Sequence, residues 1–295
     1  MTCQRWHPAD HADMLGTLYV VATPLGNLED LSPRAVKTLR EVDLIACEDT
    51  RHTRKLLNHF AIQTPTTSYH EHNEEAKAPV LITKLQEGKP IALVSDAGTP
   101  LLSDPGHRLV HACREHGIPV YSIPGPSAAT AALSVSGLPA NRFLFIGFLP
   151  RRAGLQREML KSFSQEEATL LIYLSPHGLL PTLKRIVEVL GNRRAFLIRE
   201  MTKLHETHYF GRLKELLTTL EQERARGEYT LVLEGQTSQK DQVSSQLDAA
   251  AYVAGLMETR GLTQKEAIKQ ATQELGLSRR EIYNQVETGK ARRRE

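Results

Sequence analysis

Short runs of β-branched and other apolar residues alternate with amphipathic helical patterns along the first half of the chain. The apolar runs occupy residues 18–22, 44–47, 91–95 and 120–123. Runs that are short and apolar at consecutive positions are typical of strands buried on both faces of a parallel sheet, and helices between them supply the crossover connections. The pattern predicts an α/β domain over residues 16–137.

Two helices of this domain have recognisable sequence signals at their ends. Ser32 followed by Pro33 is typical of an N-cap with proline at the first helical position. Asp104 followed by Pro105 has the same form, so it predicts a capped helix over HRLVHACREH, which Gly117 ends.

A second alternating series follows the segment GLPAN. Strand-like runs lie at residues 143–148, 169–174, 195–199 and 229–233, and the helical pattern LLPTLKRIVEVL separates two of them. This series predicts a second α/β domain over residues 138–235.

The C-terminal part of the chain has a different pattern. The polar stretch QTSQKDQVSSQ has no periodicity and predicts a linker over residues 236–248, followed by a small helical module over residues 249–295. Within the module, two S/T-x-x-E capping boxes are separated by a glycine: Thr263 with Glu266, Gly276, and Ser278 with Glu281.

A pair of helices joined by a short turn docks on nucleic acid in some proteins, but a hairpin packed on the main body has the same sequence pattern. Residues 276–294 hold six basic and two acidic side chains, so this end of the chain is locally positive. A solvated basic tail explains that charge equally well.

The composition fits a folded protein of about two domains, since 295 residues with 40% hydrophobic residues can bury substantial cores. Cys3, Cys47 and Cys113 are odd in number and lack C-x-x-C spacing, which argues against a disulfide framework and a zinc site and favours a reducing cytoplasm. Residues 1–15 lack the apolar core of a signal peptide, and no apolar run approaches the roughly 18 residues of a membrane span. We expect a soluble, cytoplasmic protein with a disordered N-terminal extension.

The turn after the first strand-like run excludes several nucleotide-binding classes. The segment ATPLGNLED has one glycine, whereas a dinucleotide site requires G-x-G-x-x-G. The glycine-rich turn of the common doubly wound methyltransferases is missing for the same reason. The chain also lacks a Walker A loop, so nothing in the sequence supports nucleotide hydrolysis.

The segment SDAGTPLLSDPG, at residues 95–106, contains polar residues, glycines and prolines within one predicted loop. It follows the third strand-like run, where open α/β sheets bind their ligands. Ala97 and Gly98 allow close approach of a ligand to the backbone, and Asp96 can accept hydrogen bonds from an amine or a hydroxyl. An ordinary tight turn before a capped helix has the same composition, so the segment alone favours neither interpretation.

A second candidate loop is PGPSAA at residues 124–129, where Ser127 occupies the expected N-cap position of an alanine-rich helix. Unpaired N–H groups at a helix N-terminus suit a carboxylate, and the small side chains of Ala128 and Ala129 leave room for one. Tight packing of an alanine-rich helix explains the same residues.

Seven segments, in order, resemble the ribosomal RNA small subunit methyltransferase I family, a branch of the tetrapyrrole methylases. They are LYVVATPLGNLEDLSPRAVKTL, DLIACEDTRHTRKLL, SYHEHNE, IALVSDAGTPLLSDPG, VYSIPGPSAATAALSVSGL, FLFIGFLPR and REMTKLHE, and the match as a whole runs from residue 16 to residue 235. The resemblance implies two α/β domains with a cleft between them for S-adenosylmethionine, a homodimer, and methylation of the 2′-hydroxyl of a cytidine in the decoding region of 16S ribosomal RNA.

The same resemblance implies which residues bind the cofactor. The correspondence covers three loops and the end of one second-domain strand: Pro24, Leu25 and Gly26; Asp96, Ala97, Gly98 and Thr99; Ser127 and Ala128; and Leu174 and Ser175. The departures from the family pattern are Leu25 and Leu102 in place of isoleucine and Cys47 in place of alanine. None of them removes a polar group.

The segment EDTRHTR follows the second strand-like run, beside the predicted cofactor loops. We hypothesise that Glu48 or Asp49 orients or deprotonates the ribose hydroxyl, and that Arg51 and Arg54 hold RNA phosphates. An internal salt bridge between Glu48 and Arg51 is the structural alternative. The basic residues Arg279 and Arg280 are further candidates for RNA contact.

The cluster HEHNE supplies a third base candidate, His70, because histidine titrates near neutral pH. Its second histidine, His72, is two residues on, so the pair does not form the H-E-x-x-H zinc motif, and no metal site is predicted. A surface loop without a catalytic role is the alternative. The segment REMTK at residues 199–203 is also expected to line the cleft, unless Glu200 only pairs with Lys203.

Two other functions remain compatible with the sequence. A relative with the same cofactor cleft could methylate a small tetrapyrrole, although EDTRHT and the basic C-terminal helices favour RNA. A noncatalytic RNA-binding protein that uses the terminal helices is the second alternative, and binding of S-adenosylmethionine distinguishes it from an enzyme.

Overall fold

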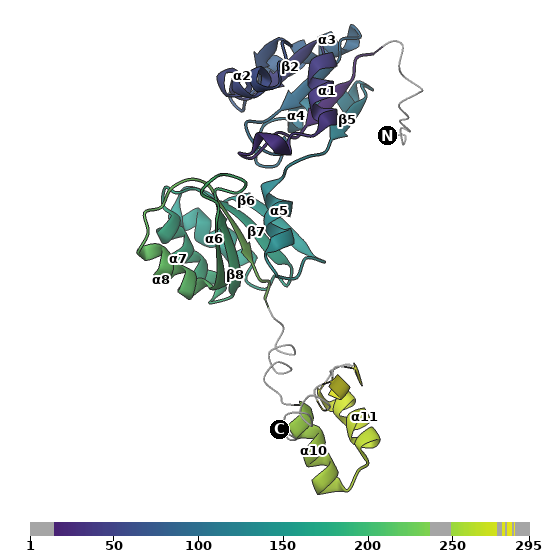
Figure 1. Cartoon of the computed structure of the whole chain (residues 1–295), viewed down its shortest axis with the longest axis vertical. Helices are drawn as coiled ribbons and strands as arrows, with labels where there is room; N and C mark the ends of the chain where they lie inside the picture. The colour runs from purple at the N-terminus through teal and green to yellow at the C-terminus, as the bar shows by residue number, and fades with distance from the viewer. Residues whose placement is uncertain (1–14, 237–248, 276–278, 281, 285, 287–295) are drawn as a thin grey trace. The chain divides into compact units, whose positions relative to one another are not determined.

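The computed structural model describes residues 15–236, 249–275, 279–280, 282–284 and 286 (Figure 1). These residues form two compact units: the first comprises the described residues up to 234 apart from 165–167, and the second comprises 165–167 with those from 235 onward. The predicted N-terminal extension, most of the predicted linker and the basic end of the chain beyond 286 lie outside the described residues. The first unit contains two five-stranded sheets.

The first sheet is entirely parallel, as the sequence predicted, with strand order β3-β2-β4-β1-β5. Its elements in chain order are β1 (Leu18–Val21), the 3-10 helix η2 (Leu28–Asp30), α1 (Pro33–Glu41), β2 (Leu44–Cys47), α2 (Thr50–His59), β3 (Thr66–Ser68), α3 (Glu74–Gln86), β4 (Ile91–Val94), α4 (His107–Glu115) and β5 (Val120–Ile123).

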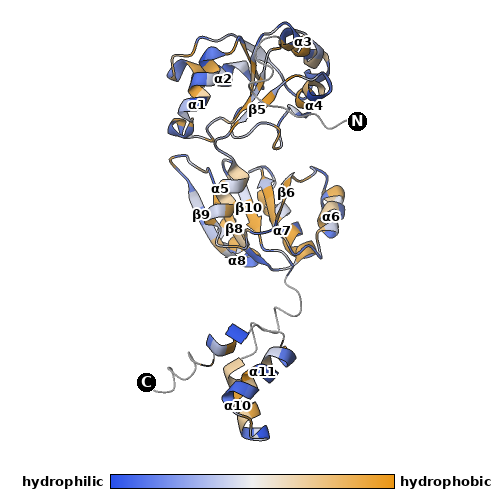
Figure 2. Cartoon of the chain, turned by 90° about the vertical axis from the view of Figure 1, so that its right-hand side faces the viewer, coloured by the Kyte–Doolittle hydropathy of each residue, from blue (hydrophilic) through white to orange (hydrophobic). Residues whose placement is uncertain are grey.

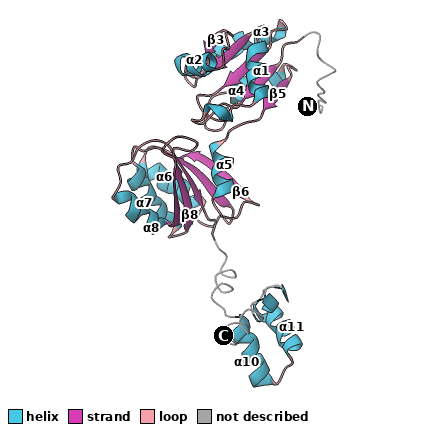
Figure 3. Ribbon diagram, in the orientation of Figure 1, coloured by secondary structure: helices cyan, strands magenta, loops and turns pink. Residues whose placement is uncertain are grey.

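Both faces of this sheet are buried under helices (Figure 3). Leu39 of α1 and Leu57 of α2 pack with Ile45 against one face. Apolar residues of α3 and α4, including Leu109, pack with Leu93 against the other. Burial on both faces explains why the strands appear in the sequence as continuous apolar runs rather than as alternating patterns.

The helix-end predictions have mixed outcomes. The Ser32 hydroxyl caps α1 by accepting a hydrogen bond from the Ala35 N–H at 3.1 Å, which confirms the first prediction. Gly117, with φ of +68°, follows the end of α4 as expected. The prediction that Asp104 caps α4 is wrong: the helix begins at His107 after Gly106, whose φ is +138°, and no side chain caps it.

The second sheet is mixed, with strand order β6-β7-β10-β8-β9; β6 and β7 pair in parallel and the other pairs are antiparallel. The elements from α5 onward are α5 (Ala128–Val135), β6 (Phe143–Phe148), α6 (Ala153–Ser162), β7 (Thr169–Leu174), α7 (Leu179–Leu190), β8 (Arg194–Arg199), β9 (Thr207–Arg212), α8 (Leu213–Glu221) and β10 (Tyr229–Leu233).

The core of the second sheet lies mainly on the face covered by α6, α7 and α8, where Leu183 and Leu217 pack against strand residues such as Leu231. Figure 2 shows β8 and β10 as largely hydrophobic ribbons. The opposite face is covered by α5, whose Ala132 and Leu133 pack with residues of β7, β8 and β10. Ser127, at the start of α5, is therefore carried by a helix that packs on the second sheet.

The second unit contains α10 (Ala249–Arg260) and α11 (Gln264–Leu275), which pack through Val253 and Ile268. The predicted capping box at Thr263 and Glu266 is confirmed, since each backbone N–H donates to the other residue's side chain, at 3.0 and 3.4 Å. The second predicted box, Ser278 with Glu281, and Gly276 lie outside the described residues. No helix in the described part of the chain is long and apolar enough to cross a membrane.

Candidate functional site

The parallel order of the first sheet brings four loops to one edge, because the carboxyl ends of parallel strands point the same way. A pocket of about 480 Å³ lies there. It is lined by residues of these loops and of the second sheet: Leu25, Glu48, Asp96, Ala97, Gly98, Thr99, Leu102, Ser103, Asp104, Ser127, Ala128, Phe148, Tyr173, Leu174, Ser175, Pro176, Glu228, Tyr229 and Thr230. We call it the cleft pocket.

A second hollow of about 530 Å³, the side pocket, adjoins the cleft pocket and shares Leu25, Asp96, Ala97 and Glu228 with it. Pro24 and Gly26 line the side pocket. The remaining residues that the sequence assigned to the cofactor line the cleft pocket. The structure therefore brings all the predicted cofactor residues together, although three loops and a strand end far apart in sequence supply them.

Hydrogen bonds from backbone and side-chain groups join the loops at this edge. Thr23 and Gly98 exchange a pair of bonds at 2.9 and 3.0 Å, and the Thr99 hydroxyl donates to the Pro126 carbonyl at 3.0 Å. The Asp49 N–H donates to Oδ1 of Asp96 at 3.2 Å. These bonds fix the second loop against the first and third, so the pocket wall is held in place before any ligand binds.

Two features of the wall suit a ligand. Gly98 has φ of +84°, and a Cβ there would lie 3.2 Å from Cδ2 of Leu25, so a larger residue would be strained and would crowd the pocket. The Ser127 hydroxyl oxygen is buried without a hydrogen-bond partner in the described part of the chain, and it does not cap α5. A buried hydroxyl of this kind is available to a bound molecule.

Four carboxylates, Glu48, Asp96, Asp104 and Glu228, line the cleft pocket, and Glu228 pairs with Lys203. Burial, reinforced by the charge of Asp96, raises the pKa of Glu48. Burial and the charge of Glu48 raise the pKa of Asp104 to about 6. The pocket therefore concentrates negative charge on carboxylates of which three are partly buried, a setting that favours a cationic ligand and also suits proton transfer near neutral pH.

Asp49 has a different role from Glu48. It is the N-cap of α2, and its Oδ1 accepts the Arg51 N–H at 2.8 Å while its Oδ2 pairs with the Arg51 guanidinium at 3.2 Å. These hydrogen bonds lower the pKa of Asp49 to about 2. The alternative of a Glu48–Arg51 salt bridge is wrong, since Arg51 pairs with Asp49. Arg54 donates to the Thr66 hydroxyl at 2.9 Å.

His70 lies just after β3 and lines neither pocket. Its Nε2 is 3.1 Å from Nδ2 of Asn73, and its Nδ1 is buried without a partner among the described residues. Its charge lowers the pKa of Glu48, so the two side chains are electrostatic neighbours. His70 therefore acts on Glu48 electrostatically and does not form part of the pocket wall.

Several residues that line the cleft pocket were not predicted from the sequence. Phe148 and Tyr173 form an aromatic pair with ring centroids 5.4 Å apart, on strands β6 and β7. Asp104 was interpreted as a helix cap, and Glu228 belongs to no recognised motif. The SDPG sequence could have drawn attention to Asp104, but no local pattern marks the other three, because only the folded second sheet places them beside the loops.

The loop that carries Asp104 is held in an unusual backbone conformation. Leu101 and Ser103 have φ of +74° and +70°, a region that side chains with a Cβ rarely adopt. Gly147, at the bulge of β6, lies against this loop, since a Cβ there would lie 2.6 Å from the Ser103 hydroxyl oxygen. The second sheet thus supports the loop of the first.

The REMTK segment contributes one residue to the two pockets described above, and Glu200 pairs with that residue. Lys203 lines the side pocket, and its Nζ pairs with Glu200 at 2.9 Å and with Glu228 at 3.0 Å. Arg279 and Arg280 are exposed helical residues of the second unit.

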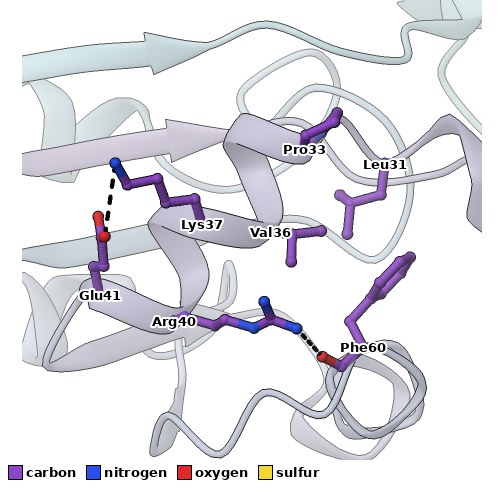
Figure 4. A pocket seen from close by; sticks show the side chains of 7 residues that line it. All are labelled: Leu31, Pro33, Val36, Lys37, Arg40, Glu41 and Phe60. Carbon is purple, nitrogen blue, oxygen red and sulfur yellow. Dashed lines mark hydrogen bonds and ion pairs between the residues drawn. The ribbon is translucent and has the colours of Figure 1, made fainter.

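A separate hollow of about 520 Å³ lies beside α1, with Leu31, Val36 and Phe60 among its lining (Figure 4). Its cations already have partners: Lys37 pairs with Glu41 at 3.9 Å, and Arg40 donates to the Phe60 carbonyl at 2.7 Å. In the part of the chain that the structure describes, no cluster of three or more His, Cys, Asp or Glu residues could hold a metal ion. Cys47 and Cys113 are buried free thiols.

Comparison with known proteins identifies related folds and a matching protein family. Residues 17–217 match the family of tetrapyrrole (corrin/porphyrin) methylases. Uroporphyrin-III-C-methyltransferase from Thermus thermophilus has a similar fold, with a TM-score of 0.54 and 22% identity over 74% of this chain and 94% of that one. Diphthine synthase is also similar, with a TM-score of 0.55 and 17% identity over 74% and 89% of the two chains.

Closer relatives carry the name ribosomal RNA small subunit methyltransferase I. The relative from Synechocystis sp. is 47% identical over 91% of this chain and 96% of its own length. The relative from Escherichia coli O157:H7 is 46% identical over 91% and 93%. With this similarity along nearly the whole chain, and the tetrapyrrole methylase fold beneath it, the protein belongs to the ribosomal RNA small subunit methyltransferase I family and is an S-adenosylmethionine-dependent methyltransferase.

Proposed function

We propose that the protein methylates the 2′-hydroxyl of a cytidine in the decoding region of 16S ribosomal RNA. The names of the relatives support a small-subunit RNA substrate. The observation that carries the proposal is the cleft pocket, where loops of the first sheet and strand ends of the second enclose acidic, aromatic and small residues around one space.

The residues of the cleft pocket fit S-adenosylmethionine. Its carboxylates suit a ligand with positive charge, the free Ser127 hydroxyl offers a hydrogen bond, and Gly98 leaves the backbone accessible. When bound, the cofactor supplies a methyl group on a positively charged sulfonium. We assign the predicted residues of the three loops, together with Leu174 and Ser175, to its binding.

Glu48 is the strongest of the three predicted base candidates. It lines the cleft pocket, and burial raises its pKa, so its carboxylate accepts a proton more readily than an ordinary glutamate. Asp49 is a weaker candidate because its pKa of about 2 makes it a poor base. We assign His70 a supporting role, since it lines neither pocket. In the proposed mechanism, a carboxylate oxygen of Glu48 takes the ribose hydroxyl proton.

The arginines proposed to contact RNA differ in their exposure and in the partners that they already have. Arg51 is almost fully exposed, so a phosphate can reach it while it pairs with Asp49. Arg54 is half-buried and already donates to Thr66, which makes it the weaker candidate. Arg279 and Arg280 support an RNA-binding role for the helical unit, and deleting residues 236–295 should then flatten the salt dependence of RNA binding.

We further propose a cytoplasmic homodimer whose subunits follow the predicted domain boundaries. Exposed apolar side chains on the first unit, such as Val135 and Phe143, support self-association. Sedimentation at several concentrations tests the dimer, and a monomer throughout would contradict it.

Transfer of a labelled methyl group tests the proposed function. The protein is incubated with labelled S-adenosylmethionine and either small ribosomal subunits that lack the modification or uroporphyrinogen. Label in 16S RNA that resists alkaline hydrolysis, as a 2′-O-methyl linkage does, is the expected result. Label on the porphyrin and none on RNA would overturn the substrate assignment, and failure to bind S-adenosylmethionine in calorimetry would favour a noncatalytic protein.

A further inference from the structure

A third hollow of the first unit, which we call the arginine pocket, lies outside the cofactor site. It has a volume of about 470 Å³ and is lined by residues from the end of β8, the loop after it and the loop between α8 and β10: Arg199, Glu200, His205, Glu223, Arg224, Arg226 and Gly227. Neither the cofactor nor the base described above uses it.

Both acidic residues of this pocket already have cationic or hydroxyl partners. Glu200 pairs with Lys203 at 2.9 Å and accepts the Glu228 N–H at 2.9 Å. Glu223 pairs with Arg199 at 3.4 Å and accepts the Tyr209 hydroxyl at 2.7 Å.

Arg224 and Arg226 are the two cationic residues of the arginine pocket that have no acidic partner among the described residues. Both side chains are exposed, and neither has a hydrogen-bond or ion-pair partner among the residues that the structure describes. Two guanidinium groups without partners at the rim of one hollow leave a net positive charge there, and guanidinium groups bind phosphate oxygens bidentately.

The two loops that line the arginine pocket have a defined backbone conformation and are hydrogen-bonded to each other. Glu200 and Thr202 have φ of +54° and +64°, a conformation that residues with a Cβ seldom adopt. Gly227, with φ of +75°, lies so close to Glu200 that a Cβ there would be 2.4 Å from its Cδ. The Glu200 N–H also donates to the Glu228 carbonyl at 2.9 Å, so the two loops are fastened together.

The arginine pocket adjoins the cofactor site through two residues. Lys203 lines the side pocket while it pairs with Glu200 of the arginine pocket. Glu228 lines both the cleft and side pockets and directly follows Gly227 of the arginine pocket. An extended polyanion with its reacting group in the cleft pocket would therefore place a neighbouring charge near Arg224 and Arg226.

We propose that the arginine pocket binds a backbone phosphate of the substrate RNA, next to the nucleotide that is methylated. This inference rests on the proposed RNA methylation and assigns it a substrate contact. Arg224 and Arg226 hold the phosphate, while the paired Glu200 and Glu223 keep the surrounding loops in place.

The test measures how binding of a 16S ribosomal RNA fragment depends on salt, in the full-length protein and in the double variant Arg224→Gln/Arg226→Gln. The slope of log affinity against log salt is negative, and for single-stranded RNA each lost phosphate contact makes it shallower by about 0.7. We therefore expect the slope to become shallower by roughly 0.7 if the two arginines share one phosphate. A double lysine variant, which keeps the charge, should retain the slope but bind more weakly.

Arg142→Gln is the matched control, because this arginine is also exposed and without a side-chain partner among the described residues, and it directly precedes β6, at the end of that strand away from Phe148 of the cleft pocket. A slope in the double glutamine variant equal to that of the wild type, or an equal change in the control, would overturn the proposal. Calorimetry with S-adenosylmethionine checks that the variants still fold and bind the cofactor. If the wild-type protein methylates RNA but the slope does not change, only this inference fails; if the wild-type protein does not methylate RNA, the proposed function fails first.

Discussion

The two sheets of the first unit contribute to the cleft pocket in different ways. The first is all parallel and buried on both faces, so its loops converge at one edge and carry short, recognisable segments such as SDAGTP. The second is mixed, and it contributes single residues, among them Phe148, Tyr173 and Glu228, from strands and a loop without a motif. One sheet supplies the polar chemistry and the other supplies the opposite wall.

This difference means that the functions of the two sheets can be separated by mutation. Changes in the loops of the first sheet should alter chemistry or cofactor affinity directly. Changes in the second sheet should act through the shape of the pocket. The predictions below test that separation, beginning with the largest expected effect.

Replacing Glu48 with glutamine should lower the turnover number by about 10²- to 10⁴-fold, the usual contribution of a general base. Cofactor affinity should change much less, because the substitution keeps the shape of the side chain. Single-turnover methyl transfer and calorimetry measure the two quantities. Glu71→Gln, an exposed acid nearby, is the control. A loss of less than severalfold in Glu48→Gln would show that this carboxylate is not the base.

Asp104 should destabilise the fold at neutral pH. Its pKa of about 6 lies above the usual 3.8, so the folded state binds the proton more tightly than the unfolded state, and stability falls as pH rises from about 4 to 6. At about 1.4 kcal/mol per pKa unit the shift corresponds to about 3 kcal/mol, but solvent screens the partly exposed carboxyl, so Asp104→Asn should be about 1–2 kcal/mol more stable than the wild type at pH 8, with roughly half that gain at pH 5. Urea denaturation at both pH values measures the difference. A variant less stable than the wild type at pH 8 would contradict the environment assigned to Asp104.

Gly147→Ala tests the support that the second sheet gives to the first. A Cβ at Gly147 would crowd the Ser103 hydroxyl and shift the loop that carries Asp104. We expect a loss of stability of about 1–3 kcal/mol and weaker cofactor binding. Gly178→Ala is the matched control, since Gly178 also has positive φ but no atom lies within 4 Å of its added Cβ. Equal effects in both variants would mean that backbone strain, and not the contact with the loop, is responsible.

Ser127→Ala should have the smallest effect, and its effect should be confined to binding. The hydroxyl has no partner among the described residues, so its removal should leave stability unchanged or slightly higher, while cofactor affinity falls by about 0.5–1.5 kcal/mol. Ser136→Ala is the converse: that hydroxyl donates to the Leu133 carbonyl and accepts the Leu138 N–H, so its loss should lower stability and spare affinity. Calorimetry and thermal unfolding distinguish the two, and loss of stability in Ser127→Ala would contradict the assignment.

The same contrast between the sheets explains what the sequence could predict. Seven of the eight predicted strand starts agree with the structure, because buried apolar runs are strong signals. The eighth strand, β8, begins one residue earlier than predicted, at Arg194. Strands β3 and β9 were missed: both lie at sheet edges, and β3 has only the three polar residues Thr66–Ser68. Neither sequence has an apolar run: β3 is Thr-Thr-Ser, and in β9, THYFGR, only Tyr209 is buried.

Within the site, the cofactor loops were predictable because each is a continuous segment. The role of Asp104 was not, because its loop has positive φ angles at Leu101 and Ser103 and packs against Gly147, which is far away in the chain. The structural alternative for Arg51 named Glu48 as its partner, whereas Arg51 pairs with Asp49. Adjacent carboxylates look equivalent in a sequence, and the N-cap geometry of α2 decides between them.

A crystal structure with S-adenosylhomocysteine bound tests most directly whether the two sheets build one cofactor site. The account predicts the ligand in the cleft pocket, in contact with the Asp96–Thr99 loop, with the Ser127 hydroxyl and with Leu174 or Ser175 of the second sheet. A ligand that contacts only one sheet, or that occupies the hollow beside α1 instead, would contradict it.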